Sequence, residues 1–152
     1  MKKLSALFIF AFILFSCNRA KDKNQDQSET TIVTEDQSYN TEYCYLKVIA
    51  KDSIILKFTR NKDSIFGKFD WKPFEKDKKI SSFNGVVVND TAKVLASYLA
   101  EGMKYSEELI FTFNPESAKV LYGEMTENEQ GIWKYKDLKN SSFQLLPKVD
   151  CK

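Results

Sequence analysis

The chain has 152 residues, of which 23 are Lys or Arg, 21 are Asp or Glu and none is His, giving a formal net charge of +2. Positive and negative residues are interleaved rather than grouped, which excludes the basic footprint of a nucleic-acid-binding protein. Without histidine, Ser-His-Asp and Cys-His nucleophilic mechanisms and most zinc sites are excluded as well.

The N-terminus has the pattern of a secretory signal. Lys2 and Lys3 precede an apolar run from Leu4 to Phe15, and a small residue, Ser16, follows. The run has 12 residues, which is too short for a helix to cross about 30 Å of hydrocarbon. Residues 1–16 are therefore predicted to be a signal peptide rather than a membrane span.

Leu14-Phe15-Ser16-Cys17 resembles the lipobox of bacterial lipoproteins. The resemblance implies that Cys17 receives lipid, including palmitate, becomes the mature N-terminus and attaches the chain to a membrane of the cell envelope. Phe15 departs from the small residue usual at its position, and the alternative is an ordinary signal cut with Cys17 as an incidental thiol. Asn18 is not the aspartate that retains some lipoproteins in the inner membrane, which favours the outer membrane.

A flexible linker is predicted over residues 17–40. Residues 18–38 are polar and lack apolar periodicity, so they cannot bury enough apolar area to offset the entropy cost of ordering. About 20 residues of coil span on the order of 25 Å, which holds a domain clear of the lipid headgroups. Residues 41–152 remain to form one domain with one core.

The remaining chain has the pattern of an antiparallel β domain. Short apolar or alternating runs, such as Ile54, Leu56 and Phe58 on one face, are separated every eight to twelve residues by turn-forming clusters. We predict an all-β fold, a single antiparallel meander of about eight strands that is curled or closed into a small barrel. Two segments, 91–101 and 115–122, also carry helix-capping residues, so their pattern is compatible with either helix or strand.

Cys44 and Cys151 are the thiols that remain once Cys17 carries lipid. In an oxidising envelope the two are expected to pair. Their disulfide would close a loop of about 108 residues, for which the chain-entropy model gives about 4–5 kcal/mol. The alternative, a reactive or metal-binding pair, lacks both a CxxC spacing and a histidine partner.

Carboxylates and aromatic residues are the remaining candidates for function. The sequence has no GxGxxG, Walker A, HExxH or EF-hand pattern, so it predicts no cofactor, no metal and no enzymatic activity. Glu75, Asp77 and Glu101 lie in expected loops and, together with Trp71, are candidate contacts to a ligand or partner. Acid-base catalysis or weak calcium binding by these carboxylates would require them to converge, which spacing does not indicate.

The folded region resembles a family of small uncharacterised lipoproteins of Bacteroidota over residues 43–152. The matching segments are Cys44-Tyr45, Lys51-Asp52-Ser53-Ile54, Gly67, Glu75-Lys76-Asp77, Gly85, Asn89-Asp90-Thr91, Ser97-Tyr98, Glu101-Gly102 and Lys148-Val149-Asp150-Cys151. The resemblance implies hairpin turns, paired end cysteines and a strand after Thr91. It carries no activity, ligand or catalytic residue.

The sequence therefore favours a non-enzymatic binding or accessory module, attached to the envelope through Cys17, with an envelope protein or a small ligand as partner. A barrel that carries a small apolar ligand is the second hypothesis and requires an internal cavity. An envelope hydrolase that uses Glu75, Asp77 or Glu101 is the third and requires a shared cleft.

Overall fold

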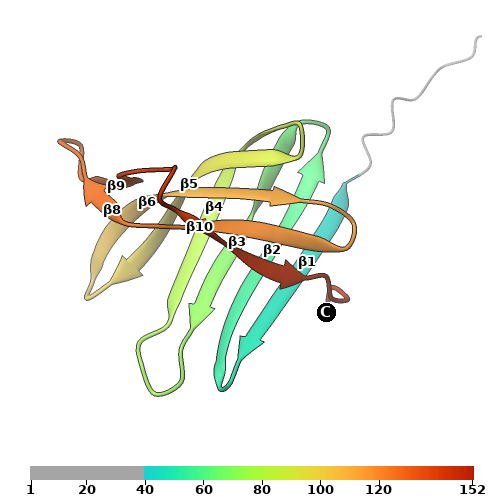
Figure 1. Cartoon of the computed structure of the whole chain (residues 1–152), viewed down its shortest axis with the longest axis horizontal. Helices are drawn as coiled ribbons and strands as arrows, with labels where there is room; N and C mark the ends of the chain where they lie inside the picture. The colour runs from blue at the N-terminus through green and yellow to red at the C-terminus, as the bar shows by residue number, and fades with distance from the viewer. Residues whose placement is uncertain (1–39) are drawn as a thin grey trace, which may run out of the picture. The chain divides into compact units, whose positions relative to one another are not determined.

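The computed structural model describes residues 40–152 and shows an all-β domain (Figure 1). The strands are β1 (Thr41–Ile49), β2 (Asp52–Asn61), β3 (Ser64–Lys72), β4 (Lys79–Val88), β5 (Thr91–Ala100), β6 (Met103–Phe113), β7 (Ser117–Tyr122), β8 (Met125–Glu127), β9 (Ile132–Tyr135) and β10 (Ser142–Pro147). The predicted signal peptide, Cys17 and the linker up to residue 39 lie outside the described residues. Within residues 40–152, no helix is long and apolar enough to cross a membrane.

The strands form one meandering sheet in the order β1-β2-β3-β4-β5-β6-β7-β10, in which every neighbouring pair is antiparallel. Strands β8 and β9 form a side hairpin, and β9 also pairs with β6 in parallel. The prediction of a curled all-β meander is confirmed. The sheet is not closed into a barrel, and the described residues contain ten strands rather than about eight.

The sheet curls onto itself so that its two halves form two layers. In Figure 1, β1 to β4 run steeply, and β5, β6, β7 and β10 cross them at a large angle. The core between the layers comes from the inward positions of both halves, because successive side chains of a strand point to opposite faces. These core residues are Tyr45, Ile54, Leu56, Phe58, Ile65, Phe69, Phe83, Val87, Ala92, Val94, Ala96, Leu109, Phe111, Phe113, Ala118, Val120 and Leu146.

Tight turns decide that the two ambiguous segments are strands. The backbone φ angles are positive at Asn89 and Asp90 (50° and 56°) and at Glu101 and Gly102 (51° and 78°), as two-residue hairpin turns require. Residues 91–100 run between these turns as β5, with alternate residues buried. Residues 117–122 form β7, which enters from a turn in which Asn114 Oδ1 accepts hydrogen bonds from the backbone N–H groups of Glu116 and Ser117.

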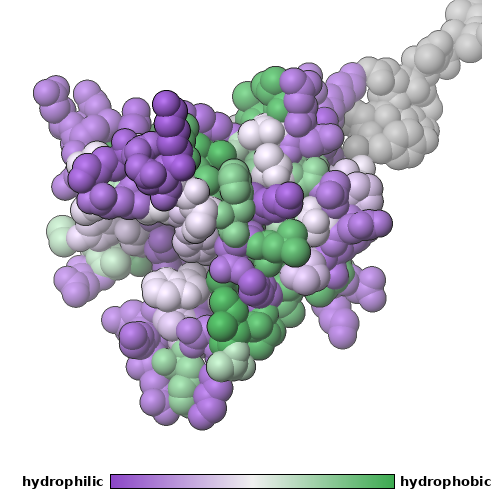
Figure 2. Space-filling view, in the orientation of Figure 1, coloured by the Kyte–Doolittle hydropathy of each residue, from purple (hydrophilic) through white to green (hydrophobic). Residues whose placement is uncertain are grey.

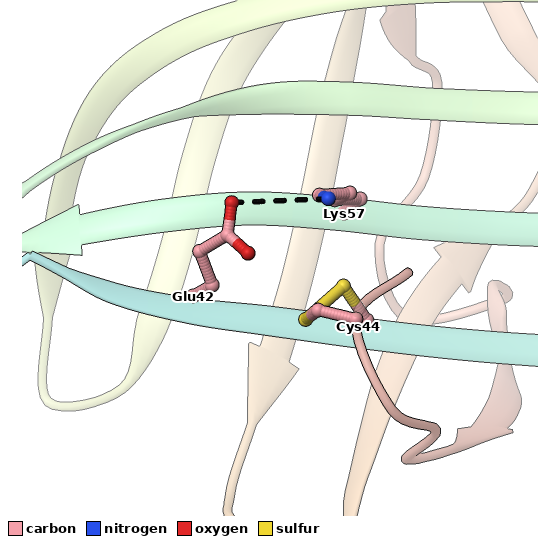
Figure 3. Close-up of a disulfide and its surroundings, with 4 residues drawn as sticks. Glu42, Cys44 and Lys57 are labelled. Atoms are coloured by element: carbon pink, nitrogen blue, oxygen red, sulfur yellow. Dashed lines mark ion pairs between the residues drawn. A yellow bond between two sulfur atoms is a disulfide. The ribbon is translucent and has the colours of Figure 1, made fainter.

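The first strand is tied to the end of the chain, where the two edges of the sheet meet. Cys44 and Cys151 form the predicted disulfide, with their Cα atoms 5.4 Å apart (Figure 3). The backbone N–H of Val149 donates a hydrogen bond to the Cys44 carbonyl at 2.9 Å, and Tyr45 forms an isolated β-bridge with Lys148. Nearby, Glu42 of β1 pairs with Lys57 of β2 at 3.8 Å. The disulfide, the Val149 hydrogen bond and the bridge to Lys148 hold the crossing layers together at one corner, whereas the Glu42–Lys57 pair joins neighbouring strands.

Removing the disulfide is expected to lower the free energy of unfolding by about 2–5 kcal/mol, because its closed loop spans 107 residues. The change is Cys44→Ser with Cys151→Ser, and the measurement is urea unfolding followed by tryptophan fluorescence. Reduced wild-type protein is the control and should lose the same amount. Equal stabilities of the oxidised wild type and the double variant would contradict the prediction.

Candidate functional site

The structure places the four predicted contact residues at the ends of strands β3 and β5. Trp71 lies near the end of β3, Glu75 and Asp77 lie in the β3–β4 connection, and Glu101 lies in the β5–β6 turn. All four are exposed, and Trp71 retains 43% of its accessible surface. None of the three carboxylates has a salt-bridge partner among residues 40–152.

Trp71 faces the concave side of the sheet, in line with the core. Its register partners are Ile54 on β2 and Lys79 on β4, and Phe69, two residues earlier on the same face, is buried. Trp71 is one inward position beyond Phe69, where the crossing layer no longer covers β3. The exposure of Trp71 makes it available for a contact, whereas core packing would have buried it.

Lys79, the register partner of Trp71, forms an ion pair with a buried carboxylate on β6. Lys79 Nζ donates to Glu107 Oε1 at 2.7 Å and to Oε2 at 2.9 Å, and Glu107 is only 8% exposed. Lys79 Nζ also lies 5.2 Å from the centre of the Tyr98 ring, which stacks on Tyr105 at 5.5 Å. A charged pair and stacked tyrosines therefore lie beside the exposed tryptophan.

We call this group the aromatic mouth, and it lies where the inward rows of β3 to β7 continue past the core. Its members are Trp71, Lys79, Tyr98, Tyr105, Glu107 and Tyr122. Figure 2 shows that apolar side chains also gather near this end, over the lower part of the β1–β2 hairpin. Val48 and Ile49 are the large exposed apolar residues at the end of β1.

Glu108 is a second buried carboxylate, and it holds the β8–β9 hairpin. It faces the other side of the sheet, where Lys93 Nζ lies 2.9 Å from Glu108 Oε1. The backbone N–H of Tyr135 donates to Glu108 Oε2 at 3.3 Å, and the Tyr135 hydroxyl donates to the Leu121 carbonyl at 2.6 Å. Both carboxylates border a pocket of about 100 Å³ between β6 and β7, which has room for only a few water molecules.

The tyrosines around this carboxylate pair remain protonated at neutral pH. Burial raises the pKa of Tyr122 to about 12, and the negative charge of Glu107 adds to the effect. Burial also raises the pKa values of Tyr98 and Tyr135, again with Glu107 as the second cause. The mouth therefore presents neutral hydroxyl groups around one ion pair.

Sequence reasoning selected Trp71 as a contact but did not bring the other members of the mouth together with it. Leu109, Phe111 and Phe113 face the core at every second position of β6. Glu107 is the next position in this alternation, so the pattern itself indicated a carboxylate that faces the core. Lys79 had no such signal, because its partner belongs to β6, two strands away in the sheet. Only the fold brings these two residues together.

The comparisons found no match to a protein-family model, to a curated protein or to a solved structure. Within residues 40–152, no group of three or more His, Cys, Asp or Glu side chains is placed to hold a metal ion. The mouth itself combines an aromatic surface, tyrosine hydroxyls and one ion pair.

Lys79→Met is expected to lower the free energy of unfolding by about 1–3 kcal/mol, because Glu107 would stay buried without its cation. Urea unfolding at neutral pH measures the loss. Adding Glu107→Gln should restore part of it. As a matched control, Lys136→Met breaks the exposed pair with Glu124 and should cost less than about 1 kcal/mol. Equal losses in the two single variants would count against a special role of the buried pair.

The raised pKa of Tyr122 predicts a loss of stability at high pH. Below pH 10, Tyr122 is protonated in both the folded and the unfolded chain, so it adds no pH dependence. Between pH 10 and about 12 the unfolded chain ionises first, so wild type loses stability relative to Tyr122→Phe. Urea unfolding of both proteins at pH 8 and pH 11 tests this. A difference between them that stays constant with pH would disprove it.

Proposed function

We propose that the protein is a non-enzymatic binding or accessory module of the cell envelope, anchored through lipid on Cys17 in the outer membrane. In this proposal the aromatic mouth contacts an envelope protein. The linker from residue 17 to residue 40 would let the domain reach that partner away from the lipid surface.

The observation that carries this proposal is the exposure of Trp71 beside the buried ion pair of Lys79 and Glu107. Tryptophan and tyrosine side chains dominate the binding energy of many protein interfaces, where they fill pockets of the partner. A lysine fixed by a buried carboxylate and by the Tyr98 ring loses little conformational entropy on binding. The mouth thus offers a rigid aromatic surface with a positioned cation.

The interior packing argues against an apolar-ligand carrier. Tyr45, Phe58 and Phe111 are almost completely buried at its centre, and their rings contact one another or share neighbouring rings. A carrier needs a cavity of several hundred Å³, whereas these side chains fill the space between the layers. The core therefore serves packing.

The carboxylates argue against a hydrolase. Glu75, Asp77 and Glu101 have no ion-pair partner among the described residues and sit on two separate connections. Glu107 and Glu108 do border one pocket, but its volume of about 100 Å³ is too small for a sugar ring. Each of the two is also engaged in an ion pair with a lysine.

The test is capture of partners from the protein's own cells, with Trp71→Ala as the decisive variant. The tagged chain is crosslinked mildly, purified and analysed by quantitative mass spectrometry. We expect a protein captured by wild type to fall at least about fivefold with Trp71→Ala, because the variant removes the anchor of the mouth. Phe143→Ala, which removes another exposed aromatic side chain on β10, should leave capture unchanged.

Two results would contradict the proposal. One is a set of captured proteins that is the same for wild type and Trp71→Ala, and the other is the absence of any captured protein. Cys17→Ser tests the anchor separately, because loss of the lipid should release the folded chain from the membrane fraction and reduce capture in cells.

A further inference from the structure

The outer face of the sheet carries a second hollow, which adjoins the aromatic mouth at Tyr98. One row of outward residues crosses four strands, with Lys68 opposite Ser82, Ser82 opposite Ser97 and Ser97 opposite Ser106. Two pockets, of about 470 and 570 Å³, meet over this row and share Ser82, Ser97 and Lys104. We call the joined pockets the outer trough.

The walls of the trough are apolar and exposed. Phe66 and Leu95 stand on one side of the serine row, each opposite Asn84 in the register. Ile80 and Leu99 stand on the other side, and Leu99 is 73% exposed. The hollow exists because the serine side chains between these walls are short. Ser82 and Ser97 place hydroxyl groups on its floor.

The trough is positively charged. Lys68, Lys78 and Lys104 line it, and none has a salt-bridge partner among residues 40–152. No acidic residue belongs to either lining. The two nearest outward carboxylates in the register are already neutralised, Asp70 by Lys72 at 3.0 Å and Glu108 by Lys93 at 2.9 Å. Three uncompensated lysines around one hollow favour an anionic ligand.

We propose that the outer trough binds an anionic carbohydrate chain, one whose sugars carry carboxylate or phosphate groups. The lysines at its borders suit the acidic groups, and Ser82, Ser97 and Asn84 offer donors and acceptors to sugar hydroxyls. The apolar walls suit the C–H faces of the rings, with Phe66 as the aromatic surface. This proposal adds a second site, which shares Tyr98 with the aromatic mouth but does not include Trp71.

Two other anionic occupants fit the trough less well. An extended acidic peptide would need backbone partners, but β3, β4 and β5 are each paired on both sides, so no strand edge is free there. An acyl chain would need an enclosed apolar path, whereas this hollow is open to solvent and has the hydroxyl groups of Ser82 and Ser97 in its lining. A carbohydrate uses the hydroxyl floor, the apolar walls and the lysines together.

Isothermal titration calorimetry with the whole chain in an uncharged detergent tests the proposal. The probes are an oligogalacturonate, a phosphorylated oligomannoside, an uncharged cello-oligosaccharide, hexaglutamate and phosphatidylglycerol vesicles. We expect binding of at least one charged oligosaccharide, and at least about tenfold weaker binding of the uncharged one. The oligosaccharide that binds tells whether carboxylate or phosphate is the preferred acid.

Variants connect the binding to the trough. Lys68→Gln with Lys104→Gln should weaken binding at least about tenfold, and Ser82→Leu should do the same by filling the floor without changing the charge. Lys119→Gln with Lys134→Gln removes equal charge from β7 and β9 and should change affinity less than about twofold. Circular dichroism checks that each variant is folded.

The proposal is overturned if neither charged oligosaccharide binds, or if hexaglutamate or vesicles bind more tightly than both. It is also overturned if the two lysine pairs weaken binding equally, or if Ser82→Leu binds like wild type, since either result would show general attraction of polyanions. Loss of partner capture through Trp71→Ala with carbohydrate binding intact would separate this site from the mouth.

Discussion

The contact between Cys44 and Cys151 is the constraint on which the arrangement of the two layers depends. No continuous ladder of backbone hydrogen bonds joins the edge strands β1 and β10. The two edges are connected by the bridge between Tyr45 and Lys148, the hydrogen bond from Val149 to Cys44 and the disulfide. Tyr45 is fully buried at this corner, and its hydroxyl donates to the Asn114 carbonyl at 2.7 Å. The crossing layers are thus fixed at one corner.

The mouth arises from the same alternation that builds the core. On β3 the inward row passes from Phe69 to Trp71, and on β5 it passes from Ala96 to Tyr98. The next strands do the same, with Leu109 followed inward by Glu107 and Val120 by Tyr122. Each of these strands exchanges an aliphatic or phenyl core residue for a larger or polar one at the next inward position, where the core ends.

Much of the fold was predictable from the chain because strand alternation and turn chemistry are local signals. The buried row of Ile54, Leu56 and Phe58 and the turn at Asn89-Asp90 are examples, and both are confirmed. The pair of Lys79 and Glu107 was not predictable, since it spans β5 and depends on the register of two hairpins at once. The uncovered position of Trp71 likewise follows from how far the crossing layer extends, which local pattern does not encode.

The same strands carry both proposed surfaces on opposite faces, which follows from the two-residue period of a strand. Ser82 and Lys78 belong to the outer trough, whereas their chain neighbours Ser81 and Lys79 face the concave side. Ser81 is buried, and its hydroxyl has no hydrogen-bond partner among the described residues. Because neighbouring side chains leave the sheet in opposite directions, substitution of an exposed outward residue leaves the mouth's contacts in place. Trp71 lines neither pocket of the trough, so the two proposed surfaces meet only at Tyr98.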